Sequence, residues 1–140
     1  MSKFILTDAY VEIAGVDLSA YAFAVDTPQE REEVDVSGFN STGAKSYLPG
    51  SKDQTVTIQM LQSFATNLVH QTLNPLFVNS STFGFSVRPT SSAISATNPR
   101  YWGTASLYQY NALAGDISAR SEIEVVLRPV TATGFVWATS

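Results

Sequence analysis

The side chains that could do acid–base chemistry are few, and their spacing does not favour it. His70 is the single histidine, and it falls on the polar side of a predicted helix, where an exposed residue is expected rather than a catalytic base. The densest group of carboxylates is Glu30, Glu32, Glu33 and Asp35. Paired carboxylates can hydrolyse glycosides, but the alternation of a strand sends these side chains to opposite faces. We therefore expect a solvated acidic strand and no enzyme activity.

Motifs for cofactor binding and other kinds of catalysis are also missing from the sequence. The glycines Gly38, Gly43 and Gly50 do not form a phosphate-binding loop, because no Gly-Lys-Ser/Thr step opens a helix. The chain has no cysteine, which excludes disulfides, a thiol nucleophile and cysteine-ligated zinc. We expect no cofactor and no metal site.

Composition favours one globular domain with a weakly charged surface. The chain has 140 residues, of which 44% are hydrophobic and only 14% charged. This length fits a single domain over residues 1–140 with a real core. A surface rich in Ser, Thr, Asn and Gln suits a subunit covered by copies of itself, although secreted β-sandwiches share the bias. The net charge is −4 and the basic residues are scattered, so specific nucleic-acid binding is not expected, and no segment is long enough for a membrane span.

Apolar residues alternate with polar ones along most of the chain, which predicts short strands. The predicted strands cover residues 9–13, 20–26, 31–36, 53–61, 82–88, 101–110, 118–128 and 135–138. In the second of these, Tyr21, Phe23 and Val25 are expected on one face and three alanines on the other. One helix is predicted from Phe64 to about Leu73, capped by Ser63 and ended by Asn74-Pro75. The fold class is therefore mostly β: a β-sandwich or barrel of about seven strands with one flanking α-helix.

Residues 30–61 contain the most unusual feature, a long glycine-rich loop at 37–52 between two amphipathic strands. The first strand has Val34 and Val36 on one face, and the second has Val56, Ile58 and Met60 on one face. Loops beyond about 12–15 residues are usually functional or disordered, so we interpret 37–52 as an assembly loop. Residues 1–8 form an N-terminal arm whose apolar Phe4, Ile5 and Leu6 can dock on a neighbour or fray.

Several of these runs resemble tail tube (major tail) proteins of long-tailed bacteriophages. The residues that carry the resemblance are Glu33-Val34-Asp35-Val36, Gly43, Leu48-Pro49-Gly50-Ser51-Lys52-Asp53, Thr55-Val56-Thr57-Ile58, Leu73, Pro75-Leu76, Val87-Arg88-Pro89, Asn98-Pro99, Tyr101, Gly103 and Thr133-Gly134. Ser51 and Trp137 depart from the pattern, because an apolar and a basic residue are expected at those two places. The resemblance covers most of the chain.

The resemblance implies a structural virion protein that assembles with itself. Such subunits form hexameric rings that stack into a tube, and their amphipathic strands line a channel through which DNA passes without specific binding. We expect the channel to be lined by residues from the polar faces of the two strands: Glu33, Asp35, Thr55, Thr57 and Gln59. We expect the loop to make inter-ring contacts through Lys45, Tyr47, Leu48, Pro49 and Gly50. Further implied partners are tape measure and tail-terminator or baseplate proteins. The expected location is the virion tail, after assembly in the host bacterial cytoplasm.

Two other functions fit a small β-rich chain. A capsid decoration or cement protein has a similar size and strand content, but does not form tubes by itself. A carbohydrate-binding β-sandwich is suggested by Tyr101, Trp102, Tyr108 and Tyr110, although aromatic residues at this density more often serve core and sheet packing.

Overall fold

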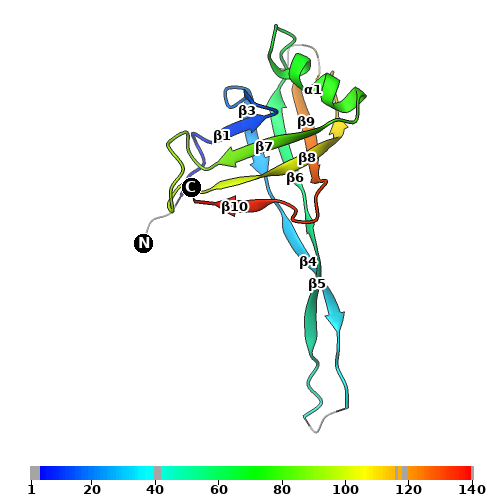
Figure 1. Ribbon diagram of the computed structural model, residues 1–140. Helices are drawn as coiled ribbons and strands as arrows, with labels where there is room; N and C mark the ends of the chain where they lie inside the picture. The colour runs from blue at the N-terminus through cyan, green and yellow to red at the C-terminus, as the bar shows by residue number, and fades with distance from the viewer. Residues whose placement is uncertain (1–3, 40–41, 116, 118–119, 140) are drawn as a thin grey trace.

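A computed structural model describes residues 4–39, 42–115, 117 and 120–139 (Figure 1). The elements follow in the order β1 (Tyr10–Ile13), β2 (Val16–Asp17), β3 (Ala22–Asp26), β4 (Gln29–Asp35), β5 (Tyr47–Gln54), β6 (Val56–Leu61), α1 (Val69–Val78), β7 (Thr82–Arg88), β8 (Arg100–Tyr110), β9 (Glu122–Pro129) and β10 (Val136–Ala138). The chain is thus mostly β with one helix, as the sequence predicts.

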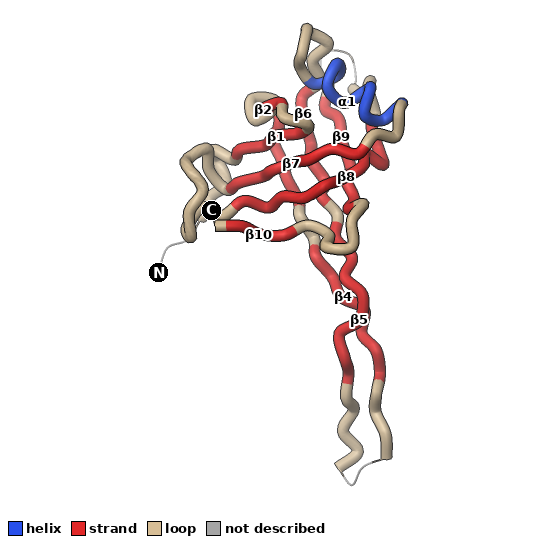
Figure 2. Tube along the Cα trace, viewed as in Figure 1, coloured by secondary structure: helices blue, strands red, loops and turns tan. Residues whose placement is uncertain are grey.

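The main sheet is antiparallel and folds over on itself. Its strand order is β2-β1-β7-β8-β9-β6-β3, and β10 pairs with β8 beside this path. The long strand β8 joins two layers, because its first residues pair with β10 and its later residues pair with β9. In Figures 1 and 2, β1, β7, β8 and β10 run across the direction of β3, β6 and β9. This arrangement confirms the predicted β-sandwich or barrel.

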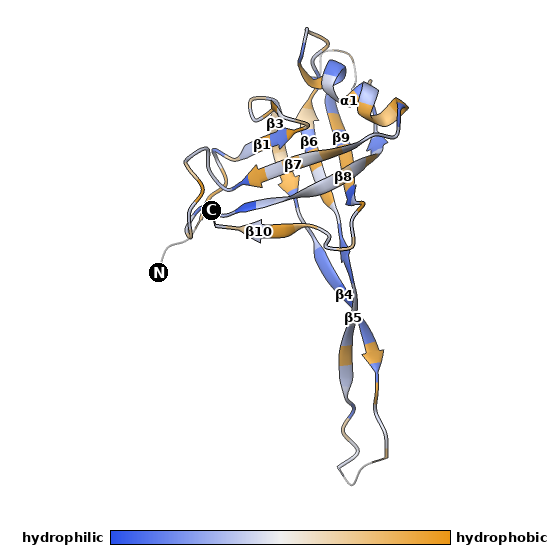
Figure 3. Cartoon of the chain, in the orientation of Figure 1, coloured by the Kyte–Doolittle hydropathy of each residue, from blue (hydrophilic) through white to orange (hydrophobic). Residues whose placement is uncertain are grey.

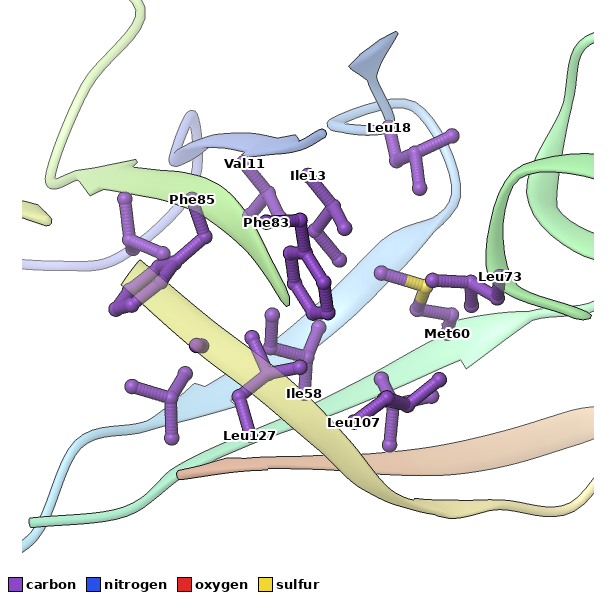
Figure 4. Packing of buried hydrophobic residues seen from close by; sticks show 14 of the residues in the cluster. Val11, Ile13, Leu18, Ile58, Met60, Leu73, Phe83, Phe85, Leu107 and Leu127 are labelled. Atoms are coloured by element: carbon purple, nitrogen blue, oxygen red, sulfur yellow. The ribbon is translucent and has the colours of Figure 1, made fainter. Parts of the chain in front are cut away.

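The hydrophobic core lies between these two layers, and the predicted alternation supplies it (Figure 4). Each of three strands sends every second side chain inward, and these residues are Val56, Ile58 and Met60, Phe83, Phe85 and Val87, and Ile123, Val125 and Leu127. Full burial of such a side chain contributes about 1.5–3 kcal/mol. The burial of nine such side chains therefore contributes more free energy than any single polar contact, and it determines which face of each strand points inward.

The predicted face of β3 is wrong at Phe23. The register between β3 and β6 shifts between Ala22 and Ala24, which pair with Met60 and Gln59. This bulge inserts one extra residue into β3, so Phe23 turns outward and is 40% exposed, while Ala22 packs against the core. A strict period of two could not reveal the bulge.

The helix begins and ends later than predicted. Asn67 has a positive φ of 59°, so the chain between Ser63 and Leu68 is not helical, and Phe64 is 53% exposed instead of facing the sheet. Ser63 does not cap α1, since the residue before its first turn is Leu68 and makes no side-chain cap. Pro75 lies inside α1, although it removes one backbone donor. The buried Val69 and Leu73 hold the helix on the body.

The predicted loop at 37–52 is shorter in the structure. Strand β5 already begins at Tyr47, where it pairs with Asp35, and Glu33 pairs with Pro49. The predicted strand 53–61 is divided at Thr55 into the end of β5 and all of β6. Strand β5 is exposed and pairs with β4 in the two-stranded sheet, so residues 47–52 lack the alternation of apolar and polar residues that a core imposes. For this reason the sequence does not predict a strand there.

Candidate assembly surfaces

The two-stranded sheet β4–β5 forms an arm that projects away from the body (Figure 1). Every residue of β4 is exposed, and so is most of β5. One face of this ribbon is apolar, because Val34 and Leu48 are direct cross-strand neighbours and Val36 follows two residues on. Their exposed fractions are 42%, 57% and 46%. Figure 3 shows the corresponding hydrophobic bands on both strands. Apolar side chains in this position suit contact with another surface.

A β-bulge sets the twist of the arm. Gly50 and Ser51 together lie opposite Glu32, between the pairs Arg31–Lys52 and Glu33–Pro49. A Cβ atom at Gly50 would lie 3.2 Å from both Glu32 Cβ and Val34 Cγ2. Glycine therefore lets the two strands approach closely, and the extra residue increases the local twist.

The opposite face of the arm carries Glu33 and Asp35, with Pro49 and Tyr47 across from them. The backbone N–H of Ser37 donates to Asp35 Oδ1 at 2.8 Å. Hydrogen bonding by Ser37, through its hydroxyl and its N–H, holds the pKa of the Asp35 carboxyl below its usual range. The Asp35 carboxylate therefore stays ionised to a lower pH than it would without Ser37.

The predicted lumen residues fall in two separate places. Thr57 and Gln59 lie on the outer face of β6, opposite the buried Val56, Ile58 and Met60. Thr55 lies between β5 and β6. Glu33 and Asp35 belong to the arm and not to the main sheet. The structure thus places all five along one continuous hairpin, but brings only the β6 residues onto the body.

The outer face of the body contains acidic residues that the sequence analysis did not select. Glu124 pairs with Gln59, and Asp26 pairs with Thr57, so these side chains share one face. Glu122 follows on the same side of β9, and it pairs with Arg120 at 2.5 Å. The alternation around Ile123 and Val125 already placed both glutamates outward. The sequence alone does not indicate that β9 lies next to β6, and this neighbourhood is what brings Glu124 beside Gln59.

The predicted inter-ring and N-terminal residues are accessible. Lys45, Tyr47, Leu48 and Pro49 are exposed, and Gly50 is half-buried. Phe4, Ile5 and Leu6 are 61%, 79% and 49% exposed. Phe4 and Leu6 also line a groove with Val25, Val87 and Trp137. The N-terminal segment therefore lies along the edge of the body with its apolar side chains partly uncovered.

His70 is not the freely exposed residue that the sequence predicts. Its Nδ1 lies 2.7 Å from the Tyr110 hydroxyl, and the Phe64 ring lies tilted against the imidazole with the ring centres 4.8 Å apart. Burial raises the pKa of Tyr110. Among the described residues, no three His, Asp or Glu side chains are grouped to hold a metal ion. In the same part of the chain, no helix is long and apolar enough to cross a membrane.

The four aromatic residues that suggested carbohydrate binding do not form one surface. Tyr101 is fully buried and packs against Phe85 and Phe135. Trp102 points to the other face of β8, where the Arg100 guanidinium lies 4.7 Å from its ring centre. Tyr110 is engaged with His70. The sugar-stacking platform expected of that alternative is therefore divided between core and surface.

Comparison with known proteins gives a clear result for the fold. A chain from the virion of a native gene transfer agent particle superimposes with a TM-score of 0.72 and 14% identity, over 95% of each chain. The SPP1 tail tube matches with a TM-score of 0.73 and 11% identity, over 99% of this chain and 80% of that one. The chain has the fold of phage tail tube proteins. This confirms the predicted resemblance at the level of fold.

Two further observations extend the likeness. The tail of an empty gene transfer agent particle, determined with C6 symmetry, matches this tail-tube fold with a TM-score of 0.69 and 13% identity. A chain of the anti-feeding prophage baseplate matches more distantly, with a TM-score of 0.57 and 12% identity. No family model and no curated protein matches the sequence. At this low identity the shared property is the backbone arrangement, so the roles of individual residues must be argued from their own contacts.

Proposed function

We propose that this protein is a structural tail tube subunit that assembles with itself into stacked hexameric rings around a DNA-conducting channel. The observation that supports this most strongly is the superposition on the gene transfer agent and SPP1 structures over nearly the whole chain. The match includes a chain from a tail with six-fold symmetry. A tube of this kind has no catalytic task, in keeping with a chain that pairs its only histidine with a tyrosine.

The surfaces of the subunit support two kinds of contact. Within the described sheet, strand β3 has a neighbour on one side only, and an unpaired edge is a template for another strand. Pairing within a closed ring removes such edges. The arm and the N-terminal segment expose apolar residues away from the core, and these are suited to contacts with other copies. We assign the arm to the contact between successive rings.

The polar face of β3, β6 and β9 is proposed to face the channel, together with Glu33 and Asp35 of the arm. Double-stranded DNA carries about one negative charge per 1.7 Å of its axis. Lys and Arg side chains would hold it. Thr57, Gln59 and Glu124 offer no cation, and the two arginines beside them are each paired with a carboxylate, Arg120 with Glu122 and Arg128 with Asp53. DNA would therefore slide along this face instead of binding to it.

Electron microscopy of the purified protein tests the proposal. At high protein concentration we expect hollow filaments with six subunits in each ring in cross-section. A chain that remains a monomer at all concentrations, and is absent from tails in isolated particles, would contradict the proposal. Binding of the monomer to a glycan array would favour the carbohydrate-binding alternative, and labelling of capsids would favour a decoration protein.

The channel assignment has a separate test. The double substitution Glu33→Lys with Asp35→Lys makes the charge of the proposed lumen more positive by four units per subunit. The new cations should hold DNA and slow its ejection, while tubes still form. The matched control is Glu12→Lys with Asp17→Lys, because these cross-strand neighbours on β1 and β2 take the same charge change at the end of the main sheet opposite to β3. Equal ejection and infectivity in the first variant and in the wild type would show that this face does not line the channel.

A further inference from the structure

The arm leaves the body through its two strands and makes one exposed ion pair with it, between Asp53 of β5 and Arg128 of β9 at 3.5 Å. Exposed ion pairs contribute little, so a buried contact at the base is needed to fix the direction of the arm. Among the strands that the structure describes, β4 and β5 pair only with each other. At the junction, the Pro28 carbonyl accepts a hydrogen bond from the Thr55 N–H at 3.3 Å. An isolated two-stranded ribbon is at best marginally stable in water. Without a further link, such a ribbon would bend at its base.

Gln54, the last residue of β5, supplies such a link. It is 4% exposed, and it is one of two buried polar residues in the described part of the chain, the other being Asn98. Gln54 Oε1 accepts the Phe135 N–H at 2.8 Å, and Gln54 Nε2 donates to the Phe135 carbonyl at 2.8 Å. Nε2 also donates to Gln29 Oε1 at 3.0 Å, which ties in β4. The Gln54 side-chain amide therefore exchanges two hydrogen bonds with the Phe135 backbone, as a paired strand residue would. Both hydrogens of Nε2 are used, one to Phe135 and one to Gln29.

The partner of Gln54 is a fixed point of the body. The Phe135 side chain is 2% exposed and meets Phe85 and Tyr101 edge-on, with ring centres 4.6 and 5.7 Å apart. Two glycines make room for this contact. Gly134 has a φ of 67°, and a Cβ atom there would collide with Gln54 Oε1. A Cβ atom at Gly103 would lie 2.7 Å from Phe135 Cδ1.

We propose that Gln54 is a positioning residue that locks the base of the arm to the turn before β10 and thereby sets the direction in which the arm leaves the subunit. The importance of that direction for assembly rests on the proposed function, but the lock itself does not. A ribbon held at one strand end by three hydrogen bonds, two of them to a buried core residue, cannot swing without breaking them. Each successive copy would then present its arm at the same angle.

The lock can be measured in the isolated subunit. Because the chain has no cysteine, spin labels can be attached to cysteines introduced at the exposed Ser46, near the arm's tip, and Thr104, on the body. Gln54→Ala should broaden the label-to-label distance distribution. It should also accelerate hydrogen exchange at the Phe135 amide by about tenfold, the effect of losing one hydrogen bond. In assembly-competent conditions the same variant should lose or shorten its tubes.

The matched control is Asn98→Ala. Asn98 is the other buried amide, and its side chain donates to the Ser92 and Ala93 carbonyls at 2.8 and 3.2 Å, away from the arm. Its loss should destabilise the subunit without changing the distance distribution. An unchanged distribution in Gln54→Ala, or equal broadening in both variants, would overturn the proposal. Failure of the wild type to form tubes would instead contradict the proposed function and leave the distance measurement valid.

Discussion

At the scale of single residues, Ser37 controls the charge of the arm at Asp35. Its hydroxyl and N–H stabilise the ionised carboxylate, so the folded-state pKa of Asp35 lies below its unfolded value. The stability from this contact is fully present above the unfolded-state pKa, and is lost as the pH falls through the folded-state value. Asp35, a proposed channel residue, would thus keep its charge to a lower pH than an aspartate without this contact.

The substitution Ser37→Ala tests this contact. Loss of the hydroxyl should raise the pKa of Asp35 toward its usual range, and the change can be followed by NMR titration of the Asp35 carboxyl carbon. Ser46→Ala is the control, because Ser46 contacts Ser37 through its backbone N–H and carbonyl. An Asp35 pKa that is the same in Ser37→Ala and in the wild type would assign the shift to another cause.

The residues that the sequence places on the correct face of their strand are those governed by simple alternation. Thr57 and Gln59 lie on the polar face of β6 as predicted, because Val56, Ile58 and Met60 are buried opposite them. Phe23 was misplaced because the bulge in β3 adds one residue that no local signal marks. Glu124 was not selected, since its place beside Gln59 depends on which strands are neighbours. That order is a property of the whole fold and not of a single stretch.

At the scale of elements, the sequence predicts one feature of the arm, its length, and misses another, the strand β5. The length of the connection between β4 and β6 was visible, but the strand character of β5 was not, because an exposed strand lacks an apolar periodicity set by a core. The helix shows the opposite error. Its apolar spacing predicts a helix, but the bounds differ from the prediction. The positive φ of Asn67 delays the start, and α1 continues through Pro75 because the packing of Val69 and Leu73 outweighs the local stop signal.

The apolar face of the arm gives the element-scale prediction. In the double variant Val34→Ser with Leu48→Ser, the body should fold normally because both side chains are exposed. If both become buried between rings, their loss costs about 2 kcal/mol, or roughly a 30-fold rise in the protein concentration needed for tube formation. Sedimentation over a concentration series measures this. Leu113→Ser, at a residue 76% exposed and distant in sequence from the arm, should leave the threshold concentration unchanged.

At the scale of the whole molecule, the proposed tube requires the arm and the surface that receives it to be different parts of the subunit. The arm extends from one end of the body (Figure 1), so the proposed stacking through it would be a head-to-tail contact. Such contacts do not close on themselves, and they generate an open filament when repeated along an axis. Each ring in the proposed tube would use its arms on one side and its receiving surfaces on the other.

This asymmetry gives a prediction for mixtures. The Val34→Ser with Leu48→Ser variant retains the receiving surface and the ring contacts but has a weakened arm. It should therefore enter growing tubes and hinder addition at the side where its own arm would bind. The mean tube length, measured by electron microscopy, should fall steadily as the variant fraction rises, even when wild-type protein remains above its own threshold concentration. A head-to-head contact would use the same surface on both partners, and the weakened variant would then be excluded from tubes and leave their length unchanged.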